Sequence, residues 1–355
     1  MTDTLLRVLS NADLDWMIAY GDLQMLAAGQ SLLRPYVSPS CVSLVIEGSL
    51  GESLAITQGA TDEAVLIDEL AQGNLVGFSP LLDAANATAV TTLKPTLILS
   101  LPIALIQAKL TDDVAFAAHF YHAISLLLSD LLRRRLEHPD GIRGWGDSSV
   151  GPIFDHRAGN DVLTVFGELR DSDIDWLTAF GQIETIPVDW VLLQAARPVE
   201  SLYILLDGQM SMSASQGTFN PLALCFLGLA DNLSDQPVLA TLTQGSMPGI
   251  ISFLDFRPLP VTVRSLTEAL VFAVPRHTLT TKLQVDDSFA SRFYRVIAIQ
   301  ILQHLQSVSM RLVEPMAINL AMDDAELDVD DLHQVSEGAK KFGWMLAQLG
   351  VNRHG

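Results

Sequence analysis

The sequence is poor in basic residues. Its 355 residues include 21 Lys and Arg against 41 Asp and Glu, which gives a formal net charge of −20 at pH 7. A surface of this composition repels phosphate backbones and anionic lipid headgroups. We therefore expect no nucleic acid among the partners of this protein.

The sequence also lacks long hydrophobic runs, although 49% of its residues are hydrophobic. The two most apolar stretches, residues 96–106 and 221–230, are shorter than the roughly 20 residues that cross a bilayer as a helix. The first residues carry acidic side chains and no basic segment followed by an apolar one, so no secretory signal is recognised. We expect a cytoplasmic protein with no transmembrane segment.

Cysteine is scarce and the usual catalytic motifs are missing. Cys41 and Cys225 stand alone among apolar residues, which is typical of small buried side chains in a reducing compartment. The eight histidines are scattered, and His119 and His122 have no Asp, Glu or Cys at ligand spacing. No nucleophile elbow, Walker loop, dinucleotide-binding glycine motif or zinc pattern is present. The sequence predicts no catalytic residue, metal site or cofactor, and indicates a protein that is not an enzyme.

What the sequence does contain is an internal repeat. Residues 9–21 (LSNADLDWMIAYG) match residues 169–181 (LRDSDIDWLTAFG) at an offset of 160, so that Trp16 corresponds to Trp176. Three further pairs of segments match in the same order: 43–50 with 203–210, 72–77 with 244–249, and 116–124 with 289–297. The offset in the last two pairs is 172 to 173, so the second copy holds extra residues in its middle. Two copies of one domain are therefore predicted.

Each copy has the same order of elements. A short helix with the Asp-Trp motif is followed by short apolar runs between Gly, Pro and Asn, as in strands joined by turns. A long helix ends each copy, because apolar residues recur at three- and four-residue steps in 116–132 and 289–305. The predicted segments are two domains, the linker between them and an acidic tail: 1–137, 161–312, 138–160 and 313–355.

A short helix, a roll of short strands and a long terminal helix resemble the cyclic-nucleotide-binding domain of catabolite activator proteins and protein kinase A regulatory subunits. The resemblance covers most of both copies. It is most specific in 248–266 (PGIISFLDFRPLPVTVRSL), which is similar to the phosphate-binding cassette of that family, and continues in 271–279 (VFAVPRHTL). The resemblance implies a mainly β fold with α-helices: two jelly-roll-like β-roll domains, each with an N-terminal helix and a long C-terminal helix.

The second cassette has lost the polar groups that the family uses. Gly249 remains, but Ile250 stands where the family has the ribose-binding Glu, and Leu259 stands where it has the phosphate-binding Arg. Arg257 and Arg264 flank the cassette and are alternative cations. We expect the side chain of Arg264 to face outward from a strand.

The first cassette, residues 76–93, shows the same losses. Gly77 remains, Phe78 replaces the Glu, and Ala87, within one residue, replaces the Arg. The lost Arg pair costs roughly 2 to 5 kcal/mol and the lost Glu hydrogen bond roughly 1 to 3 kcal/mol. The resemblance with these changes predicts that a cyclic nucleotide is an unlikely ligand. The alternative is a small-ligand sensor that holds a cyclic nucleotide or a more apolar ligand in one pocket.

The long helices suggest two further expectations. The run RRR at 133–135 is interpreted as a solvated helix end whose cations complement the helix dipole. In the family such helices often pair across a dimer, and here one chain supplies both. The apolar faces of 124–132 and 297–305 are therefore predicted to pack on each other as an internal pseudo-dimer.

The tail combines an acidic run, residues 322–331, with a possible amphipathic helix. We assign the apolar stripe of this helix to partner binding, with docking on the chain's own second domain as the equal alternative. The stripe consists of Leu332, Val335, Phe342, Met345, Leu346 and Leu349.

Only 43 residues follow Leu312, and they are acidic where transcription factors of the resembled family have a basic helix-turn-helix. Direct DNA binding is therefore not expected. The sequence favours a non-enzymatic regulatory or scaffolding protein that acts through protein–protein contacts.

Overall fold

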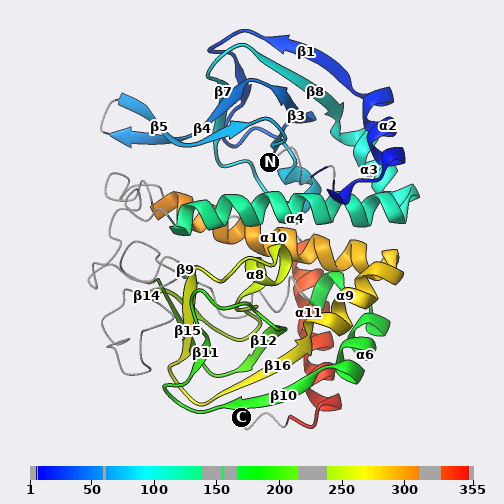
Figure 1. Cartoon of the computed structure of the whole chain (residues 1–355), viewed down its shortest axis with the longest axis vertical. Helices are drawn as coiled ribbons and strands as arrows, with labels where there is room; N and C mark the ends of the chain where they lie inside the picture. The colour runs from blue at the N-terminus through cyan, green and yellow to red at the C-terminus, as the bar shows by residue number, and fades with distance from the viewer. Residues whose placement is uncertain are drawn as a thin grey trace. The chain divides into compact units, whose positions relative to one another are not determined.

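The structure, a computed structural model, describes residues 5, 7–58, 61–137, 154–155, 166–214, 238–311 and 329–351. The chain forms two compact units (Figure 1). Unit 1 comprises Met1–Asp130 and Ala290–Met322, and unit 2 comprises Leu131–Phe289 and Asp323–Gly355. Most of the long helix of the second copy therefore belongs to unit 1, while the end of the first long helix belongs to unit 2.

Unit 1 contains a roll of two sheets with strand orders β1-β8-β3-β6 and β2-β7-β4-β5 (blue and cyan in Figure 1). The pairs whose register is resolved are antiparallel. Val42, Val45 and Leu50, on β3 and β4, are at most 1% exposed and form part of the core. The strands are β1 (Asp22–Leu26), β2 (Ser31–Leu33), β3 (Cys41–Glu47), β4 (Ser49–Gln58), β5 (Thr61–Ala71), β6 (Leu75–Val76), β7 (Ala89–Thr92) and β8 (Thr96–Pro102).

Unit 2 contains a second roll, with strand orders β10-β16-β12 and β11-β15-β13-β14-β9 (green and yellow in Figure 1). Its strands are β9 (Phe154–Asp155), β10 (Gln182–Ile186), β11 (Val191–Leu193), β12 (Ser201–Asp207), β13 (Met210–Ala214), β14 (Val238–Leu242), β15 (Val261–Ser265) and β16 (Ala269–Pro275). β9 comes from the predicted linker and pairs in parallel with β14. Part of that segment therefore belongs to the sheet of unit 2.

The strand pairs of the two rolls repeat in register. Asp22 of β1 lies opposite Ser100 of β8, and Gln182 of β10 lies opposite Ala273 of β16. These positions are related by the same offsets of 160 and 173 residues that relate the matching segments of the sequence. The predicted fold class is confirmed as two rolls of antiparallel strands with flanking helices, although the architecture is mixed α and β rather than mainly β.

Helices precede and follow the strands of each roll in the same order. Those of the first copy are α2 (Asn11–Tyr20), α3 (Ile103–Asp112) and α4 (Val114–Glu137), and those of the second are α6 (Asp171–Phe180), α9 (Arg276–Val285) and α10 (Asp287–Arg311). The helix α11 (Val329–Gln348) follows them in the tail. α4 is long and apolar enough to span a membrane by composition, but 67% of its apolar window is buried inside the protein, as in a core helix.

The long helices begin with the same cap in both copies. The carboxylate of Asp113 accepts a hydrogen bond from the backbone amide of Phe116 at 3.0 Å, and that of Asp286 accepts one from Phe289 at 2.9 Å. Each cap satisfies an amide that the first turn of a helix leaves unpaired.

The Asp-Trp motif attaches each short helix to the start of a long one. The ring centroid of Trp16 lies 5.1 Å from that of Phe116, and that of Trp176 lies 5.6 Å from that of Phe289. Each of these Trp rings also has a Lys Nζ near its face, at 5.7 and 5.6 Å from the centroid. The repeated sequence motif thus encodes a repeated aromatic contact.

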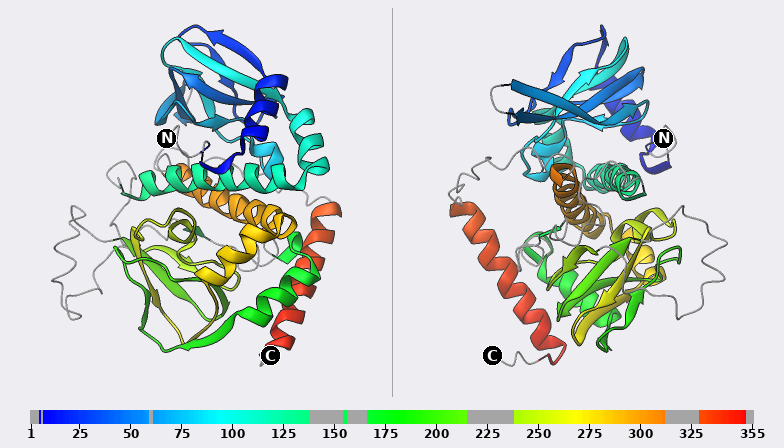
Figure 2. Two further views of the ribbon diagram at one scale, coloured as in Figure 1. Left: turned by 45° about the vertical axis from the view of Figure 1, so that its right-hand side comes forward. Right: turned by 90° about the vertical axis from the view of Figure 1, so that its left-hand side faces the viewer.

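The two long helices contact each other within unit 1. The rings of His122 on α4 and Tyr294 on α10 stack with centroids 4.0 Å apart, and the helices lie side by side in Figures 1 and 2. Burial and the neighbouring His119 lower the pKa of His122 to about 4, and burial raises the pKa of Tyr294. This contact is one that the predicted internal pseudo-dimer requires.

Candidate functional site

Apolar side chains close the second cassette. Gly249 has φ of +80° and precedes α8 (Ile250–Asp255), and a Cβ at this position would lie 2.7 Å from the Leu193 side chain. This close approach requires glycine whether or not a ligand binds. Ile250 is 5% exposed and Leu259 is 1% exposed. The two residues that the sequence analysis aligned with the family's Glu and Arg are therefore buried hydrocarbon side chains.

The first cassette is closed in a similar way. Gly77 has φ of +83°, and a Cβ there would lie 2.4 Å from the carbonyl oxygen of Cys41. Phe78, 9% exposed, leads into the 3₁₀ helix η1 (Ser79–Leu82). The hydroxyl of Ser79 is buried and has no hydrogen-bond partner within the described part of the chain. The positive φ of the turn glycine thus recurs in both cassettes, and in the first it is followed by the buried ring of Phe78.

The structure gives the register of the two cassettes. The amide of Tyr36 donates to the carbonyl of Asn86 at 2.7 Å, and the amide of Ala196 donates to the carbonyl of Leu259 at 2.8 Å. Asn86 is therefore the counterpart of Leu259, one residue from the predicted Ala87. The side-chain amide of Asn86 already donates to two backbone carbonyls, at 2.9 and 2.8 Å.

A buried arginine from α4 binds the second cassette. The guanidinium of Arg133 donates to both carboxylate oxygens of Asp255, at 2.9 and 3.0 Å, to the carbonyl of Pro258 at 2.6 Å and to the hydroxyl of Ser252 at 3.1 Å. The side chains of Arg133 and Asp255 are 3% and 8% exposed. A pairing of this kind, with further hydrogen bonds, is what allows a charge to be buried.

This contact corrects the sequence interpretation of residues 133–135 as a solvated helix end. Arg133 and Arg135 are 3% and 6% exposed, so the end of α4 is packed inside the protein. The burial of Arg133 depends on tertiary structure. Its hydrogen-bond acceptors lie in the cassette of the other copy, so the sequence around residue 133 does not indicate them.

A second arginine covers the same short helix. The guanidinium of Arg276 donates to the carbonyl of Ser252 at 2.7 Å and lies 5.3 and 4.6 Å from the ring centroids of Phe253 and Phe256. Burial lowers the pKa of Arg276. α8 is therefore held by Arg133 and by Arg276, one from each copy of the repeat.

The two flanking arginines are committed to carboxylates. Arg257 is 47% exposed at its side chain and pairs with Asp255 at 2.9 Å. Arg264 extends from β15 and pairs with Asp189, whose side chain is 76% exposed, at 2.7 Å. Each of these cations therefore already has an acidic partner.

Unit 1 has weaker counterparts of these contacts. Gln306 of α10 donates to the carbonyl of Ala85 at 3.2 Å, and these residues correspond to Arg133 and Pro258 at the offset of 173. Arg295 also pairs with Asp83, whose side chain is 74% exposed. Each cassette is thus bonded to the long helix of the other copy, by a buried ion pair in unit 2 and by an amide and an exposed ion pair in unit 1.

The helix α11 packs on its own unit. Phe342, Met345 and Leu346 are at most 3% exposed, and the ring of Phe342 lies 5.1 Å from that of Phe166. α11 contacts α6, and Figure 2 shows it (red) beside that helix. Of the two docking surfaces that the sequence allows, the structure shows the one on the second domain. Leu349 is half-buried, and the side chains of Leu332 and Val335 lie outside the described residues.

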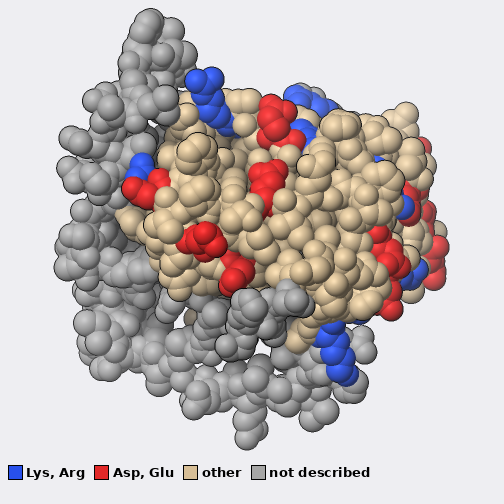
Figure 3. All heavy atoms as spheres, turned by 90° about the horizontal axis from the view of Figure 1, so that it is seen from below, with Lys and Arg blue, Asp and Glu red and all other residues tan. Residues whose placement is uncertain are grey.

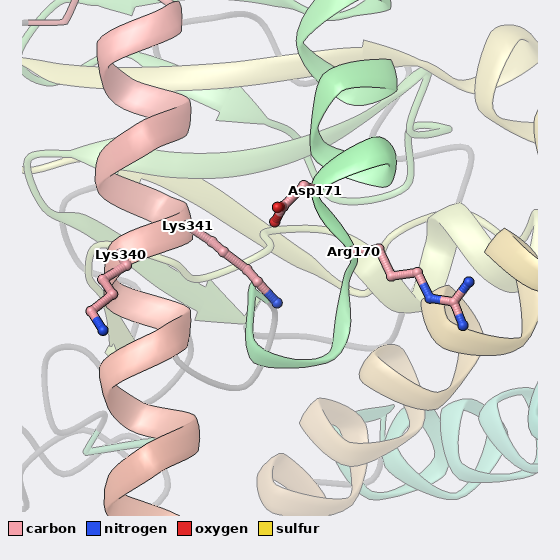
Figure 4. A pocket seen from close by; sticks show the side chains of 4 residues that line it. All are labelled: Arg170, Asp171, Lys340 and Lys341. Carbon is pink, nitrogen blue, oxygen red and sulfur yellow. The ribbon is translucent and has the colours of Figure 1, made fainter.

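A hollow between α6 and α11 is lined by Arg170, Asp171, Lys340 and Lys341. In Figure 4, Asp171 and Lys341 point toward the space between the helices, whereas Arg170 and Lys340 point away. The ammonium of Lys341 donates to the carbonyl of Leu169 at 2.9 Å. These cations do not converge on one point, and on the face in Figure 3 the basic side chains also lie apart.

The two histidines of α4 that the sequence analysis considered together, His119 and His122, make separate contacts. His119 lies 2.8 Å from the buried carboxylate of Asp13 through its Nδ1, and His122 stacks on Tyr294. Within the described ranges, no three His, Cys, Asp or Glu side chains form a group that could hold a metal. Cys41 is a free thiol, and Cys225 lies outside the described residues.

No family profile and no curated protein matches the chain. Solved structures do. The regulatory subunit PfPKA-R with bound cAMP is 12% identical, with 99% of this chain and 88% of that chain covered and a TM-score of 0.31. The regulatory subunit of a cAMP-independent protein kinase A from Trypanosoma cruzi, bound to guanosine, is 13% identical, with coverage of 79% and 80% and a TM-score of 0.29.

The N-terminal domain of a transcriptional regulator from Streptomyces coelicolor is 21% identical, with 40% of this chain and 91% of that chain covered and a TM-score of 0.32. Two of these three structures are regulatory subunits of protein kinase A, a group of proteins that the cassette resemblance named, and the third comes from a transcriptional regulator. Similarity at this level concerns the fold. What this chain binds has to be argued from its own residues.

Proposed function

We propose that this protein is a non-enzymatic regulatory or scaffolding subunit that acts through protein–protein contacts and binds no cyclic nucleotide. The observation that carries the proposal is the burial of Phe78, Ile250 and Leu259 at positions where a nucleotide site needs charged groups. A cyclic phosphate and a ribose hydroxyl would each lose water there without gaining a partner, which disfavours binding.

The arginine contacts support a structural use of the second cassette. Four hydrogen bonds from Arg133 tie α8 and the loop after it to the end of α4. Because Arg133 and Asp255 are both buried, removing the side chain of one would leave the charge of the other buried without this partner, at a cost of roughly 3 to 5 kcal/mol. The second cassette thus has a structural role, because it fixes α8 to the end of α4. We propose that the outer surface of the protein, rather than this cassette, binds the protein partner.

A sensor for an apolar ligand is the weaker candidate. Such a ligand needs an opening beside the cassette glycines, but the neighbouring side chains of Phe78 and Ile250 are 9% and 5% exposed and occupy the space themselves. A ligand would have to displace packed side chains, and that displacement costs free energy that the ligand's own contacts would have to offset.

The proposal is tested by purifying the full chain from its native cells under mild conditions, and by analysing the proteins and the small molecules that accompany it. We expect an equimolar protein partner and no cyclic nucleotide in the extract of the heat-denatured complex. Recovery of the chain alone, with a stoichiometric cyclic nucleotide, would contradict the proposal.

A further inference from the structure

Unit 1 has an apolar hollow beside its N-terminal helix. The hollow has a volume of about 310 Å³, and α2, β3 and β8 line it with hydrophobic side chains. Ile18 on α2 is 63% exposed, and Leu14, Leu44 and Ile46 are half-buried. Four apolar side chains therefore meet solvent at one place on this unit.

The counterparts of these residues in unit 2 are covered. At the offset of 160, Leu14 corresponds to Ile174, Leu44 to Ile204 and Ile46 to Leu206. The three counterparts are 0%, 1% and 0% exposed. Among the described residues, the same surface of the roll is thus covered in unit 2 and exposed in unit 1.

The described part of α11 lies on the covered surface. Its Gln348 hydrogen-bonds to Thr178, the counterpart of Ile18, at 3.0 Å, and to Asp175, the counterpart of Asp15, at 3.2 Å. Phe342, Met345 and Leu346 of α11 are buried in the same unit. The repeat therefore shows what kind of element fits this surface: an amphipathic helix with apolar residues at three- and four-residue steps.

We propose that the apolar hollow on α2 binds an amphipathic helix of a partner protein, with apolar residues on one face and basic residues beside them. The proposal rests on the proposed function in taking the ligand to be a protein. Charge supports a basic helix. Asp15, Asp22 and Glu47 are exposed and lie next to or near the lining residues in sequence, and α11 carries Lys340 and Lys341 beside its buried Phe342.

The probe is a fluorescein-labelled peptide of residues 334–351, which carries the α11 pattern, and its binding to the full chain is followed by fluorescence anisotropy. Ile18→Asp places a charge in the hollow, and we expect it to weaken binding at least about tenfold, which corresponds to about 1.4 kcal/mol. Leu66→Asp is the matched control, because Leu66 is 56% exposed on β5 of the same unit and does not line the hollow. It should change the affinity less than about twofold.

A second variant tests the proposal without changing residue 18, where a substitution could disturb the fold. Asp15→Lys changes only an exposed charge, and we expect it to weaken binding about threefold, with the difference shrinking at high salt. Peptide binding that is the same in Ile18→Asp and in the unmodified chain overturns the proposal. So does a dimer of the full chain in sedimentation that Ile18→Asp converts to monomer, because the occupant is then a second copy.

This outcome is separable from that of the proposed function. A peptide that binds the hollow of a chain that also binds cyclic nucleotide would support the hollow and contradict the proposed function. A chain that carries an equimolar native partner, retains it in Ile18→Asp and ignores the peptide would support the proposed function and contradict the hollow.

Discussion

The two units share one roll, and they differ in how their outer surfaces are covered. In unit 2 the N-terminal helix α6 is covered by α11, and the cassette is joined to α4 by the buried pair of Arg133 and Asp255. In unit 1 the equivalent helix α2 borders an open apolar hollow, and the cassette is held by Gln306 and by an exposed ion pair. Within the described residues, the surface beside α6 is covered by α11, whereas the side chains of the equivalent surface beside α2 are exposed. The difference is the reason why the docking surface is proposed on unit 1.

The largest expected effect on stability concerns the packing of α11 on the rest of unit 2. Phe342→Ala removes a ring that is 1% exposed and packs on Phe166, and we expect it to lower the free energy of unfolding of unit 2 by about 3 to 5 kcal/mol. Trp344→Ala on the same helix is the matched control, because Trp344 is 37% exposed. Chemical denaturation followed by a probe in each unit measures both. Equal losses for the two variants would show that α11 is not docked as described.

The next largest effect concerns the contact between each cassette and the long helix of the other copy. Arg133→Ala leaves the buried Asp255 paired with Arg257, whose side chain is 47% exposed, and we expect the free energy of unfolding to fall by about 3 kcal/mol. Gln306→Ala at the equivalent position removes one hydrogen bond at 3.2 Å and should cost about 1 kcal/mol or less. Urea unfolding of the two variants is the measurement. Similar losses would mean that the two contacts are equivalent and the contrast between the units is wrong.

The buried His122 of unit 1 makes the stability of the protein depend on pH. The pKa of His122 is lowered to about 4 in the folded chain, so between pH 6.5 and 4 the unfolded chain takes up a proton that the folded chain refuses. Stability at this site is therefore lost as pH falls through that window and is constant below it. The loss is on the order of 3 kcal/mol. His122→Phe keeps the ring on Tyr294, and its unfolding free energy should fall less than that of the unmodified chain between these pH values.

The smallest effect is expected at the exposed pair of unit 1. Arg295→Gln removes the partner of Asp83, whose side chain is 74% exposed, and should cost less than about 1 kcal/mol. The cost should shrink further in high salt because solvent screens exposed charges. Thermal denaturation at low and high salt checks this. If Arg295→Gln lowers the free energy of unfolding as much as Arg133→Ala does, the exposed ion pair of unit 1 and the buried ion pair of unit 2 are equally important for stability, and the contrast is wrong.

The repeat and its fold could be predicted from the sequence because they depend on local patterns. The Asp-Trp motifs at Trp16 and Trp176, the turn glycines and the periodic apolar residues of the long helices each leave a signal within a few residues. The structure places the motifs in equivalent aromatic contacts. Because the chain holds two copies of the domain, each motif could be compared with its counterpart, which a single domain would not allow.

The contacts of the arginines could not be predicted in this way. A run of three arginines at a helix end has the same sequence pattern whether it meets water or a buried carboxylate, and Asp255 lies 122 residues from Arg133. The prediction of Ala87 had an uncertainty of one residue because the second cassette holds one residue more between Gly249 and Leu259 than the first holds between Gly77 and Asn86. The hydrogen bond from Tyr36 identifies Asn86 as the counterpart. The apolar stripe of α11 was visible, but the surface that it covers depends on the tertiary structure.

The central claim is that neither cassette keeps the charged groups that hold a cyclic nucleotide, because Phe78 and Asn86 in the first and Ile250 and Leu259 in the second stand at the positions of the family's Glu and Arg. Isothermal titration calorimetry of the full chain with cyclic AMP and cyclic GMP tests it most directly. The account predicts no saturable heat for either nucleotide up to about 1 mM, which corresponds to about −4.1 kcal/mol. A dissociation constant below about 100 μM, or about −5.5 kcal/mol, for either nucleotide would contradict it.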